Sequence, residues 1–435
     1  MTAVPTGRPT AAVLLVRAFD ADATYLSFRW IDDPDNPQVH VVEAGQRDAL
    51  MRHLDAGLIG GSDEQTADQA RQAVTGMLTD AISEEAMSRR LGRVLLPARV
   101  RRSLVARAAD GAVRVQITPS RALARVPWEL LVVDDHHRLI ELADVVYEPP
   151  AAIHVGRSRL PEPWSAVQGR PVCYLVDPRL PSKTGMGQVL WQRSGSPAED
   201  LFLERIEQCE VTAGSGIGED VNRWELQEDL AERPRRLFYF GHVSSTLDQP
   251  GSSSLHIGDT VDVWGLAEPM NDAHRPLSAL DLLLGTSSPE LGPDELHRPA
   301  PPRSGAQLWP MPPRVALIAC EGGADYRSSE TFGLVTVMFS AGAEVVVTTR
   351  WALPSDRAFA EFAGVTTVPG PTLELALAVD LTQEEGDPAA ALARWQRGKL
   401  EEWRAAPGPA TSPLTWAAVG AHVCPPRSVV YREEI

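Results

Sequence analysis

Lysine, cysteine and long apolar runs are all scarce in this chain of 435 residues, and each scarcity argues against a class of protein. Only two of the 41 basic residues are lysines, Lys183 and Lys399, a bias typical of a GC-rich bacterial genome. The 58 acidic residues outnumber the basic ones and give a formal net charge of −17. General nucleic-acid binders and proteins that bind anionic membranes need a basic surface, so we predict no nucleic-acid and no membrane partner.

The four cysteines lie far apart and form no CxxC pair: Cys173, Cys209, Cys320 and Cys424. This spacing argues against a disulfide framework and a zinc ribbon, and it favours a reducing compartment. No segment approaches the roughly 18–20 apolar residues of a membrane span. The N-terminal run AAVLLV (11–16) has no basic stretch before it and no cleavage site, so it does not resemble a secretory signal. We therefore predict a cytoplasmic protein.

Motifs for common cofactors are missing as well. There is no P-loop, and GSGIG (214–218) lacks the full pattern of a dinucleotide-binding loop. Residues 134–137 (Asp-Asp-His-His) offer metal-ligating side chains, but consecutive residues rarely converge on one ion, and a polar turn is the favoured interpretation. We predict neither a cofactor nor a metal site.

What the chain does have, from about residue 170, is an alternation of short apolar runs and helical patterns. The runs are PVCYLVD (171–177), RLFYFGH (236–242), RVALIAC (314–320) and AEVVVTTRW (343–351). Such runs are typical of strands buried on both faces of a parallel sheet. Helical patterns lie between them at 197–208, 224–232, 277–284 and 329–342. The alternation predicts a layered α/β/α fold with a mostly parallel sheet.

Three other segments have distinct patterns. Residues 11–42 show the alternation of two or three strands, and residues 46–105 look helical. Residues 286–313 contain eight prolines in 28 positions, so we predict an irregular surface segment there. It is either a solvated connection or a loop that contacts substrate. In the last helical pattern, Ser329 is the predicted N-cap and Gly342 the predicted end.

Two of the predicted strands end on reactive side chains, His242 and Cys320. The carboxyl ends of parallel strands lie at one edge of a sheet, so these side chains can meet although they are far apart in the chain. An imidazole that takes the thiol proton during attack, and then protonates a leaving amine, turns a cysteine into an effective nucleophile. The glycines after Cys320 let a substrate carbonyl approach its backbone N–H, and the N–H of Val243 can complete an oxyanion hole. Strand position alone leaves a structural role for the histidine open.

Several motifs in order resemble the CHAT family of caspase-like peptidases, in one clan with caspases, metacaspases and separases. They are FGHV (240–243), IACEGG (318–323), Glu330 with Gly333-Leu334, AGAE (341–344) and TTRW (348–351), flanked by LGRVLLPARV (91–100), TPSRALARVPWELL (118–131) and LTWAAVGAHV (414–423). The resemblance implies a caspase-like fold, Cys320 as nucleophile and His242 as general base and acid. It also implies that no cofactor is needed. We divide the chain into an N-terminal α/β region of unknown role (1–90) and a CHAT domain (91–432), whose catalytic core begins near residue 168.

Three residues depart from the family pattern. Val243 follows the histidine where glycine is usual, and its branched side chain can crowd a substrate carbonyl. Arg350 replaces the usual leucine before Trp351, and Gly323 lies where serine is common.

The resemblance implies a cysteine endopeptidase that cleaves one or a few protein substrates in bacterial defence or signalling. By the same resemblance the substrate is encoded nearby, and an activating partner protein is expected. Asp177, at the end of PVCYLVD, is a candidate for selecting Arg or Lys before the cut, and Glu321 is a second candidate substrate-binding residue. Two alternatives stay open: a catalytically silent interaction module with the same fold, and a hydrolase of small amides that uses the same catalytic dyad of Cys320 and His242.

Overall fold

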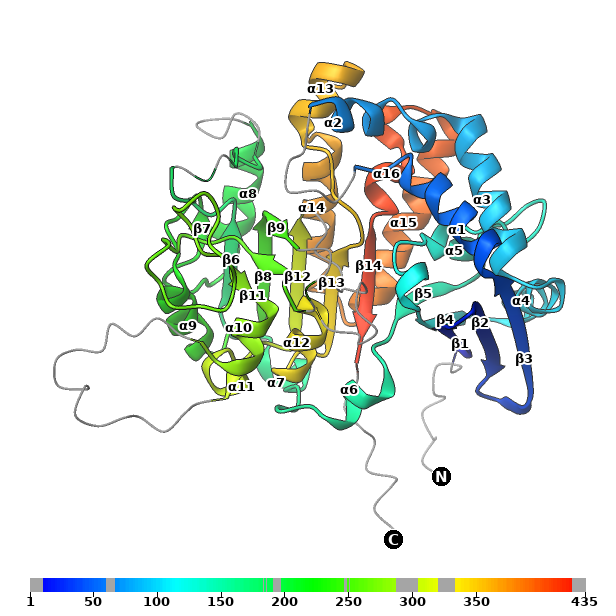
Figure 1. Ribbon diagram of the computed structural model, residues 1–435, viewed down its shortest axis with the longest axis horizontal. Helices are drawn as coiled ribbons and strands as arrows, with labels where there is room; N and C mark the ends of the chain where they lie inside the picture. Colours follow the sequence, from blue (N-terminus) through cyan, green and yellow to red (C-terminus); the bar gives the residue numbers. More distant parts are fainter. Residues whose placement is uncertain are drawn as a thin grey trace, which may run out of the picture.

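The computed structural model describes residues 11–59, 67–182, 184, 186–190, 197–245, 249, 251–286, 304–319 and 333–424. Within these residues, eleven strands form one sheet in the order β3-β2-β1-β4-β5-β14-β13-β12-β8-β6-β7 (Figure 1). The strands are β1 (Ala12–Asp20), β2 (Ala23–Trp30), β3 (Asp33–Glu43), β4 (Val113–Thr118), β5 (Asp144–Tyr147), β6 (Val172–Val176), β7 (Gly216–Ile217), β8 (Arg236–Gly241), β12 (Arg314–Ala319), β13 (Val345–Thr349) and β14 (Val419–Val423).

Most neighbouring strands of this sheet run parallel. The antiparallel pairs are β1 with β2, β2 with β3, and β13 with β14. Strand β1 pairs in parallel with β4, so the strands of the N-terminal region belong to the same sheet as those that follow. A second, small sheet has the order β11-β10-β9, with β9 (Val243–Ser244), β10 (Ser254–Leu255) and β11 (Leu277–Ser278).

Helices lie on both sides of the large sheet (Figure 1). Their bounds are α1 (Ala44–Asp55), α2 (Ala67–Val74), α3 (Ala81–Leu95), α4 (Ala98–Asp110), α5 (Leu139–Leu142), α6 (Ala151–Val155), α7 (Trp164–Val167), α8 (Pro197–Glu207), α9 (Arg223–Ala231), α10 (Ala279–Leu284), α11 (Gly305–Leu308), α12 (Leu334–Ser340), α13 (Asp356–Ala363), α14 (Pro371–Thr382), α15 (Pro388–Ala405) and α16 (Pro413–Trp416). Among the described residues, no helix has the length and apolar character needed to cross a bilayer.

Alternate residues of the central strands feed two separate hydrophobic cores. In β8, Phe238 and Phe240 pack into the core that also holds residues of α14 and α15. Leu237 and Tyr239 point the other way, into the core formed with α9, α10 and α12. Because side chains alternate across a strand, a sheet covered on both faces requires strands that are apolar at nearly every position. The predicted α/β/α layering is therefore confirmed.

The last ten residues of the Pro-rich segment, 304–313, are more regular than the composition predicts. Residues 287–303, like Ser329, lie outside the described residues. The end of the segment, however, forms helix α11, and Trp309 directly after it is fully buried. Ser304 caps this helix, and the missing Cβ of Gly305 lets α11 approach α10, since a Cβ there would lie 2.0 Å from the carbonyl oxygen of Leu282. The prediction of an irregular surface segment over all of 286–313 was therefore wrong.

Candidate active site

Strands β8 and β12 are parallel neighbours in the large sheet. Their register pairs Arg314 with Arg236 at one end and Ala319 with Gly241 at the other. The next residues in the chain are His242 after Gly241 and Cys320 after Ala319. Cys320 and Glu321 lie outside the described residues, so the distance between the thiol and the imidazole stays untested.

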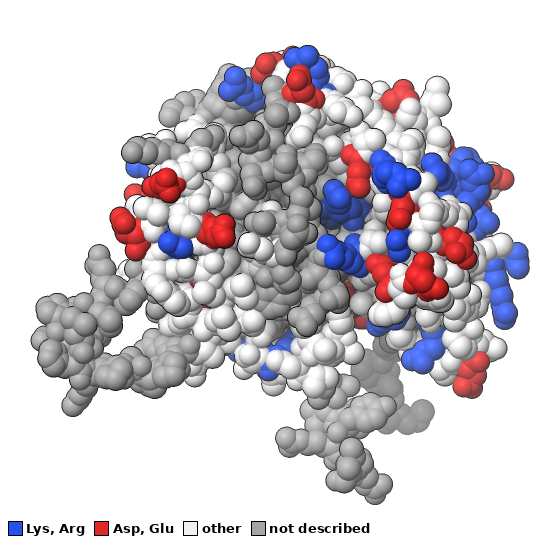
Figure 2. All heavy atoms as spheres, viewed as in Figure 1, with Lys and Arg blue, Asp and Glu red and all other residues white. Residues whose placement is uncertain are grey.

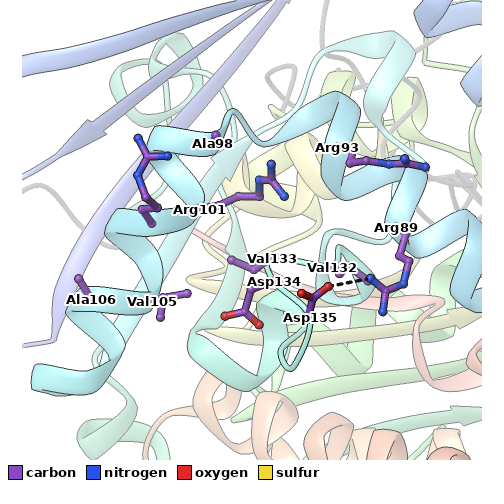
Figure 3. Close-up of a pocket in the computed structure, with 11 residues that line it drawn as sticks. Arg89, Arg93, Ala98, Arg101, Val105, Ala106, Val132, Val133, Asp134 and Asp135 are labelled. Atoms are coloured by element: carbon purple, nitrogen blue, oxygen red, sulfur yellow. Dashed lines mark hydrogen bonds and ion pairs between the residues drawn. The ribbon is translucent and has the colours of Figure 1, made fainter.

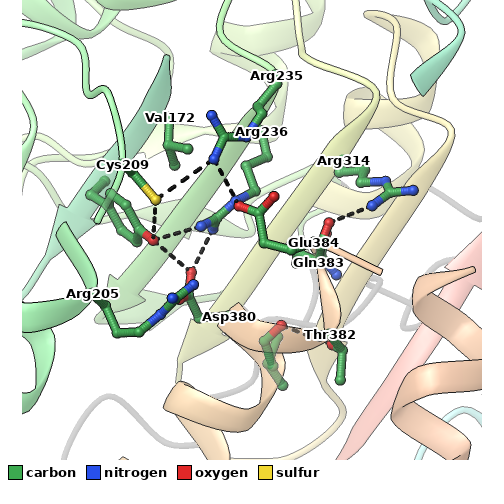
Figure 4. A network of polar contacts seen from close by, with 12 residues as sticks. Val172, Arg205, Cys209, Arg235, Arg236, Arg314, Asp380, Thr382, Gln383 and Glu384 are labelled. Carbon is green, nitrogen blue, oxygen red and sulfur yellow. Dashed lines mark hydrogen bonds and ion pairs between the residues drawn. The ribbon is translucent and has the colours of Figure 1, made fainter. Parts of the chain in front are cut away.

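A buried ionic network fixes the opposite end of β8 (Figure 4). Arg236 and Asp380 are both fully buried and form an ion pair of 2.5 Å, and Arg236 also contacts Glu384 at 2.6 Å and the hydroxyl of Tyr174 at 2.6 Å. Arg205 occupies the second oxygen of Asp380 at 2.8 Å. A buried cation must be paired in this way, because an uncompensated charge in the interior is strongly destabilising. The network anchors β8 to α14, which fixes the strand that leads to His242.

His242 is held through both its ring and its backbone. The ring Nε2 lies 2.7 Å from the carbonyl oxygen of Gly187, which can only accept, so Nε2 carries the hydrogen and Nδ1 keeps the lone pair of the neutral ring. The carbonyl oxygen of His242 accepts hydrogen bonds from the hydroxyl of Tyr239 at 2.6 Å and the backbone N–H of His256 at 3.1 Å. Gly241 makes room for this arrangement, because a Cβ there would lie 2.6 Å from the Tyr239 oxygen.

The backbone N–H of Val243 points away from the strand beside it. Val243 pairs with Leu255 in the antiparallel β9–β10 ladder, and the hydrogen bond from the His256 N–H to the His242 oxygen makes this a non-hydrogen-bonded pair. Strand β9 is the edge of its sheet. The side chain of Val243 is buried, with 6% of its surface exposed, so it packs inward while its N–H faces the strand edge.

Sequence reasoning missed a chain of hydrogen bonds next to His242. The Oγ of Ser244 lies 2.8 Å from Nε2 of His256, whose Nδ1 lies 3.0 Å from Nε2 of His274. Nδ1 of His274 lies 2.6 Å from the backbone oxygen of Asp259. Both histidines are fully buried, and no sequence pattern links residues spaced this way.

The hydrogen bonds from Ser244 through His256 and His274 to Asp259 allow only one placement of the ring hydrogens while both histidines are neutral. The Asp259 oxygen can only accept, so His274 donates from Nδ1 and accepts at Nε2. His256 must then donate from Nδ1, which leaves its Nε2 to accept from the Ser244 hydroxyl. Burial, together with the nearby His274 and His242, lowers the pKa of His256 well below its usual value, and burial also lowers the pKa of His274. The neutral rings are therefore the favoured state, and they tie β9 to the loop that follows β10.

Asp177 lies at the end of β6 and holds the segment that contacts His242. Its carboxylate is buried, and it accepts hydrogen bonds from the backbone N–H groups of Val189 at 2.9 Å and Leu190 at 3.4 Å. Asp177 has a φ of 48°, in the left-handed region that aspartate tolerates better than most residues. Its predicted role in selecting a basic substrate residue stays a prediction.

Two of the three described cysteines have environments that disfavour a thiolate. Cys173 lies inside β6, and burial raises its pKa, with a further contribution from Asp229. Cys424 lies 3.3 Å from Nδ1 of His154, but burial raises its pKa to about 11. Cys209 contacts Arg235 at 3.6 Å and the Tyr174 hydroxyl at 4.0 Å in the network of Figure 4. Among the described residues, no group of three or more His, Cys, Asp or Glu side chains could hold a metal ion.

The layered fold and the paired strand ends define a caspase-like α/β protein. A family model for the CHAT domain matches residues 85–423, so the chain belongs to the CHAT domain family, a caspase-like protease family. A comparison with curated protein sequences found no match.

Among solved structures, the chain is similar to separase from Saccharomyces cerevisiae in its complex with securin. One crystal structure, at 3.0 Å, matches with a TM-score of 0.50 and 8% sequence identity, over 95% of this chain and 30% of the separase chain. A second, at 2.6 Å, matches with a TM-score of 0.49 and 8% identity, over 94% of this chain and 30% of that one. At 8% identity this likeness concerns the fold alone, and the chain spans less than a third of the separase chain.

Proposed function

We propose that the protein is a cysteine endopeptidase of the CHAT type, with Cys320 as nucleophile and His242 as general base and acid. The observation that carries the proposal is the register of β8 and β12. It pairs Gly241 with Ala319, the residues directly before His242 and Cys320. Parallel strands that end together bring the residues after them to the same edge of a sheet.

The proposed reaction uses the free lone pair of His242. Nδ1 takes the thiol proton of Cys320 while the sulfur bonds to the carbonyl carbon of the substrate peptide. When the tetrahedral intermediate collapses, its C–N bond breaks and His242 gives the proton to the leaving amine. Water then attacks the thioester, His242 takes a proton from the water, and that proton returns to the departing sulfur. No cofactor enters these steps.

The oxyanion of the tetrahedral intermediate needs preorganised hydrogen-bond donors. We assign this role to the backbone N–H groups of Val243 and Cys320. The β9–β10 register supports the first, because it turns the Val243 N–H away from its own sheet. The inward packing of its side chain also reduces the crowding expected from valine at this position. One such donor contributes a factor on the order of 10²–10³ in rate.

The substrate class follows from the family. We propose that the enzyme cuts one or a few proteins in the bacterial cytoplasm, in defence or signalling, and that its substrate is encoded nearby. Asp177 and Glu321 are the proposed substrate-binding residues. A cleavage profile of a peptide library should show enrichment of Arg or Lys before the cut, and Asp177→Ala should reduce it. A profile without basic enrichment, or an unchanged one in Asp177→Ala, excludes this role of Asp177.

An activating partner is proposed as well. The hydrogen bond from His242 to Gly187 keeps residues 186–190 against the imidazole, which supports a low activity of the isolated protein. A partner that moves this segment would expose the ring. Full-rate cleavage of the neighbouring gene product by the purified chain, with no added factor, contradicts this part of the proposal.

The dyad is tested with Cys320→Ala and His242→Ala in the full chain. Labelling by a thiol-directed peptide electrophile should disappear in Cys320→Ala and fall by about 10²–10⁴-fold in His242→Ala. Cys209→Ala is the matched control, because it removes a partly exposed thiol from outside the proposed site. If the wild type is labelled no faster than Cys320→Ala, the protein is instead an interaction module. If the wild type is labelled but hydrolyses only small amides, the protein is a small-amide hydrolase rather than an endopeptidase.

A further inference from the structure

A cavity of about 820 Å³ lies between helices α3 and α4, and the segment 132–135 forms its third wall (Figure 3). Helix α3 contributes Arg89 and Arg93, four residues apart and so on one face. Helix α4 contributes residues at the same kind of spacing, with Ala98, Arg101 and Val105 among them. The short Leu96-Pro97 connection joins the two helices, so the cavity occupies the corner between them.

Four arginines line this cavity, but only one has a carboxylate partner. Arg89 pairs with Glu85 at 2.7 Å and with Asp135 at 3.4 Å. Asp134 is the other acid of the wall. It accepts hydrogen bonds from the backbone N–H groups of His136 and His137, each at 2.8 Å, and so stabilises the turn that it begins.

The remaining arginines are unpaired. Within the described part of the chain, Arg93, Arg101 and Arg102 form no ion pair with any acid, although acids outnumber bases in the sequence. The Nε of Arg101 is in addition buried with no hydrogen-bond partner. In Figure 2, basic and acidic side chains lie side by side on the right of the molecule, where Figure 1 shows α3 and α4.

Such a cluster favours an anionic ligand. A buried N–H without an acceptor is costly, so an anion that contacts Arg101 relieves this penalty, and the other arginines that line the cavity add favourable charge. The planar guanidinium matches phosphate in a bidentate geometry. The cavity also has an apolar side formed by Val105, Val132 and Val133, which offers a surface for the organic part of a ligand.

We propose that this cavity binds a small phosphorylated molecule of nucleotide size, with its phosphates on Arg93, Arg101 and Arg102. The volume lies within the range of roughly 300–1,000 Å³ typical of small-molecule sites. A long nucleic acid fits less well, because the net charge of −17 repels an extended polyanion beyond the cavity. Figure 1 shows α3 and α4 well apart from β8 and β9, so this site is separate from the proposed peptidase site and does not depend on it.

The experiment is calorimetric titration of the full-length chain with inorganic pyrophosphate and with ATP. Both should bind, more weakly as salt increases, and Arg93→Gln/Arg101→Gln should weaken both at least tenfold. Arg99→Gln is the matched control, since Arg99 is an exposed arginine of α4 that does not line the cavity. Ala98→Trp keeps every charge but fills the cavity, and it should also abolish binding. Circular dichroism checks that each variant is folded.

Three results would overturn the proposal. The first is no binding of either probe at millimolar concentration. The second is equal binding by the double variant and by Arg99→Gln. The third is single-stranded RNA that binds through Arg93 and Arg101 more tightly than ATP does, which would make the site a nucleic-acid surface. Loss of peptidase activity in Cys320→Ala leaves all of these measurements unchanged, so the two proposals fail separately.

Discussion

Next to His242, the hydrogen bonds of Ser244, His256 and His274 fix the positions of hydrogens as well as those of heavy atoms. The backbone oxygen of Asp259 at one end of the Ser244–His256–His274 chain can only accept, and this single constraint passes through both rings to the serine. Arg223, the first residue of α9, forms a fully buried ion pair at 2.7 Å with the carboxylate of Asp259. These hydrogen bonds thus connect β9, which carries Val243, to the buried Asp259–Arg223 ion pair.

The two histidines should both carry their hydrogen on Nδ1. Long-range ¹⁵N–¹H correlation spectra of histidine-labelled protein at pH 7.5 distinguish the two neutral forms of each ring. The His256→Asn and His274→Asn variants assign the signals by their loss. A hydrogen on Nε2 of either ring would contradict the arrangement, because it would place two donors or two acceptors against one another.

The same burial makes stability depend on pH. The pKa of His256 is well below its usual value of about 6.5 in the folded chain, so in mild acid the unfolded chain binds the proton that the native chain refuses. The free energy of unfolding should therefore fall as pH drops below about 6.5, by up to about 1.4 kcal/mol per pH unit from this residue. Besides burial, the neighbouring His274 and His242 disfavour a positive charge on His256. For His274, Asp259 favours the charge and Arg223 disfavours it, and burial outweighs Asp259.

Urea unfolding at pH 7.5, 6.0 and 5.0 measures this dependence. His256→Asn should show a shallower decline than the wild type, and His53→Asn, at an exposed position on α1, should not. Asp356 acts in the opposite direction, because burial raises its pKa to about 6, so its contribution decreases stability as pH rises through about 4 to 6. Because Asp356 is present in both chains, its contribution cancels when wild type and His256→Asn are compared. Equal slopes of the free energy of unfolding against pH in the two chains would refute the prediction.

At the scale of elements, the sequence predicts best where one physical requirement dominates. Strands β6, β8, β12 and β13 follow from apolar runs because both faces of the sheet are covered, and their ends therefore located His242 at the edge of the sheet. Helix α11 could not be predicted, since its stability comes from the buried Trp309 and from close packing on α10 rather than from local propensity. Ser244, His256 and His274 carried no signal either, because loop geometry alone brings them together.

Two helical glycines should respond to alanine with opposite signs. In α3, a Cβ at Gly92 would lie 2.0 Å from the carbonyl oxygen of Val132, so Gly92→Ala must push the helix away from that wall, at a cost of about 1–3 kcal/mol. In α15, a Cβ at Gly398 would have nothing within 4 Å, so Gly398→Ala should stabilise by about 0.5–1 kcal/mol. Urea unfolding of both variants tests the pair, and a shift of the same sign in both would show that α3 does not pack as described.

At the scale of the whole molecule, the sheet continues across the joint between β5, β14 and β13. Strand β5 meets β14 at the pair Tyr147 and His422, while β14 runs antiparallel to β13. Arg350, directly after β13, bridges this joint with bonds of 2.9 Å to each oxygen of Glu129 and 2.6 Å to the Tyr147 hydroxyl. The arginine that departs from the family pattern is thus matched by a buried carboxylate from the segment before β5.

Arg350→Leu, the residue usual in the family, should therefore destabilise this chain. It would leave Glu129, of which 1% is exposed, buried without its cation, at a cost of about 3–5 kcal/mol in the free energy of unfolding. Glu129→Gln in the Arg350→Leu background removes the uncompensated charge, so the double variant should be more stable than Arg350→Leu alone. Urea unfolding of the four chains forms a double-mutant cycle whose coupling energy should exceed about 1 kcal/mol. Additive effects would show instead that the two parts of the sheet are held by the strand pairing and the apolar core, with no contribution from this ion pair.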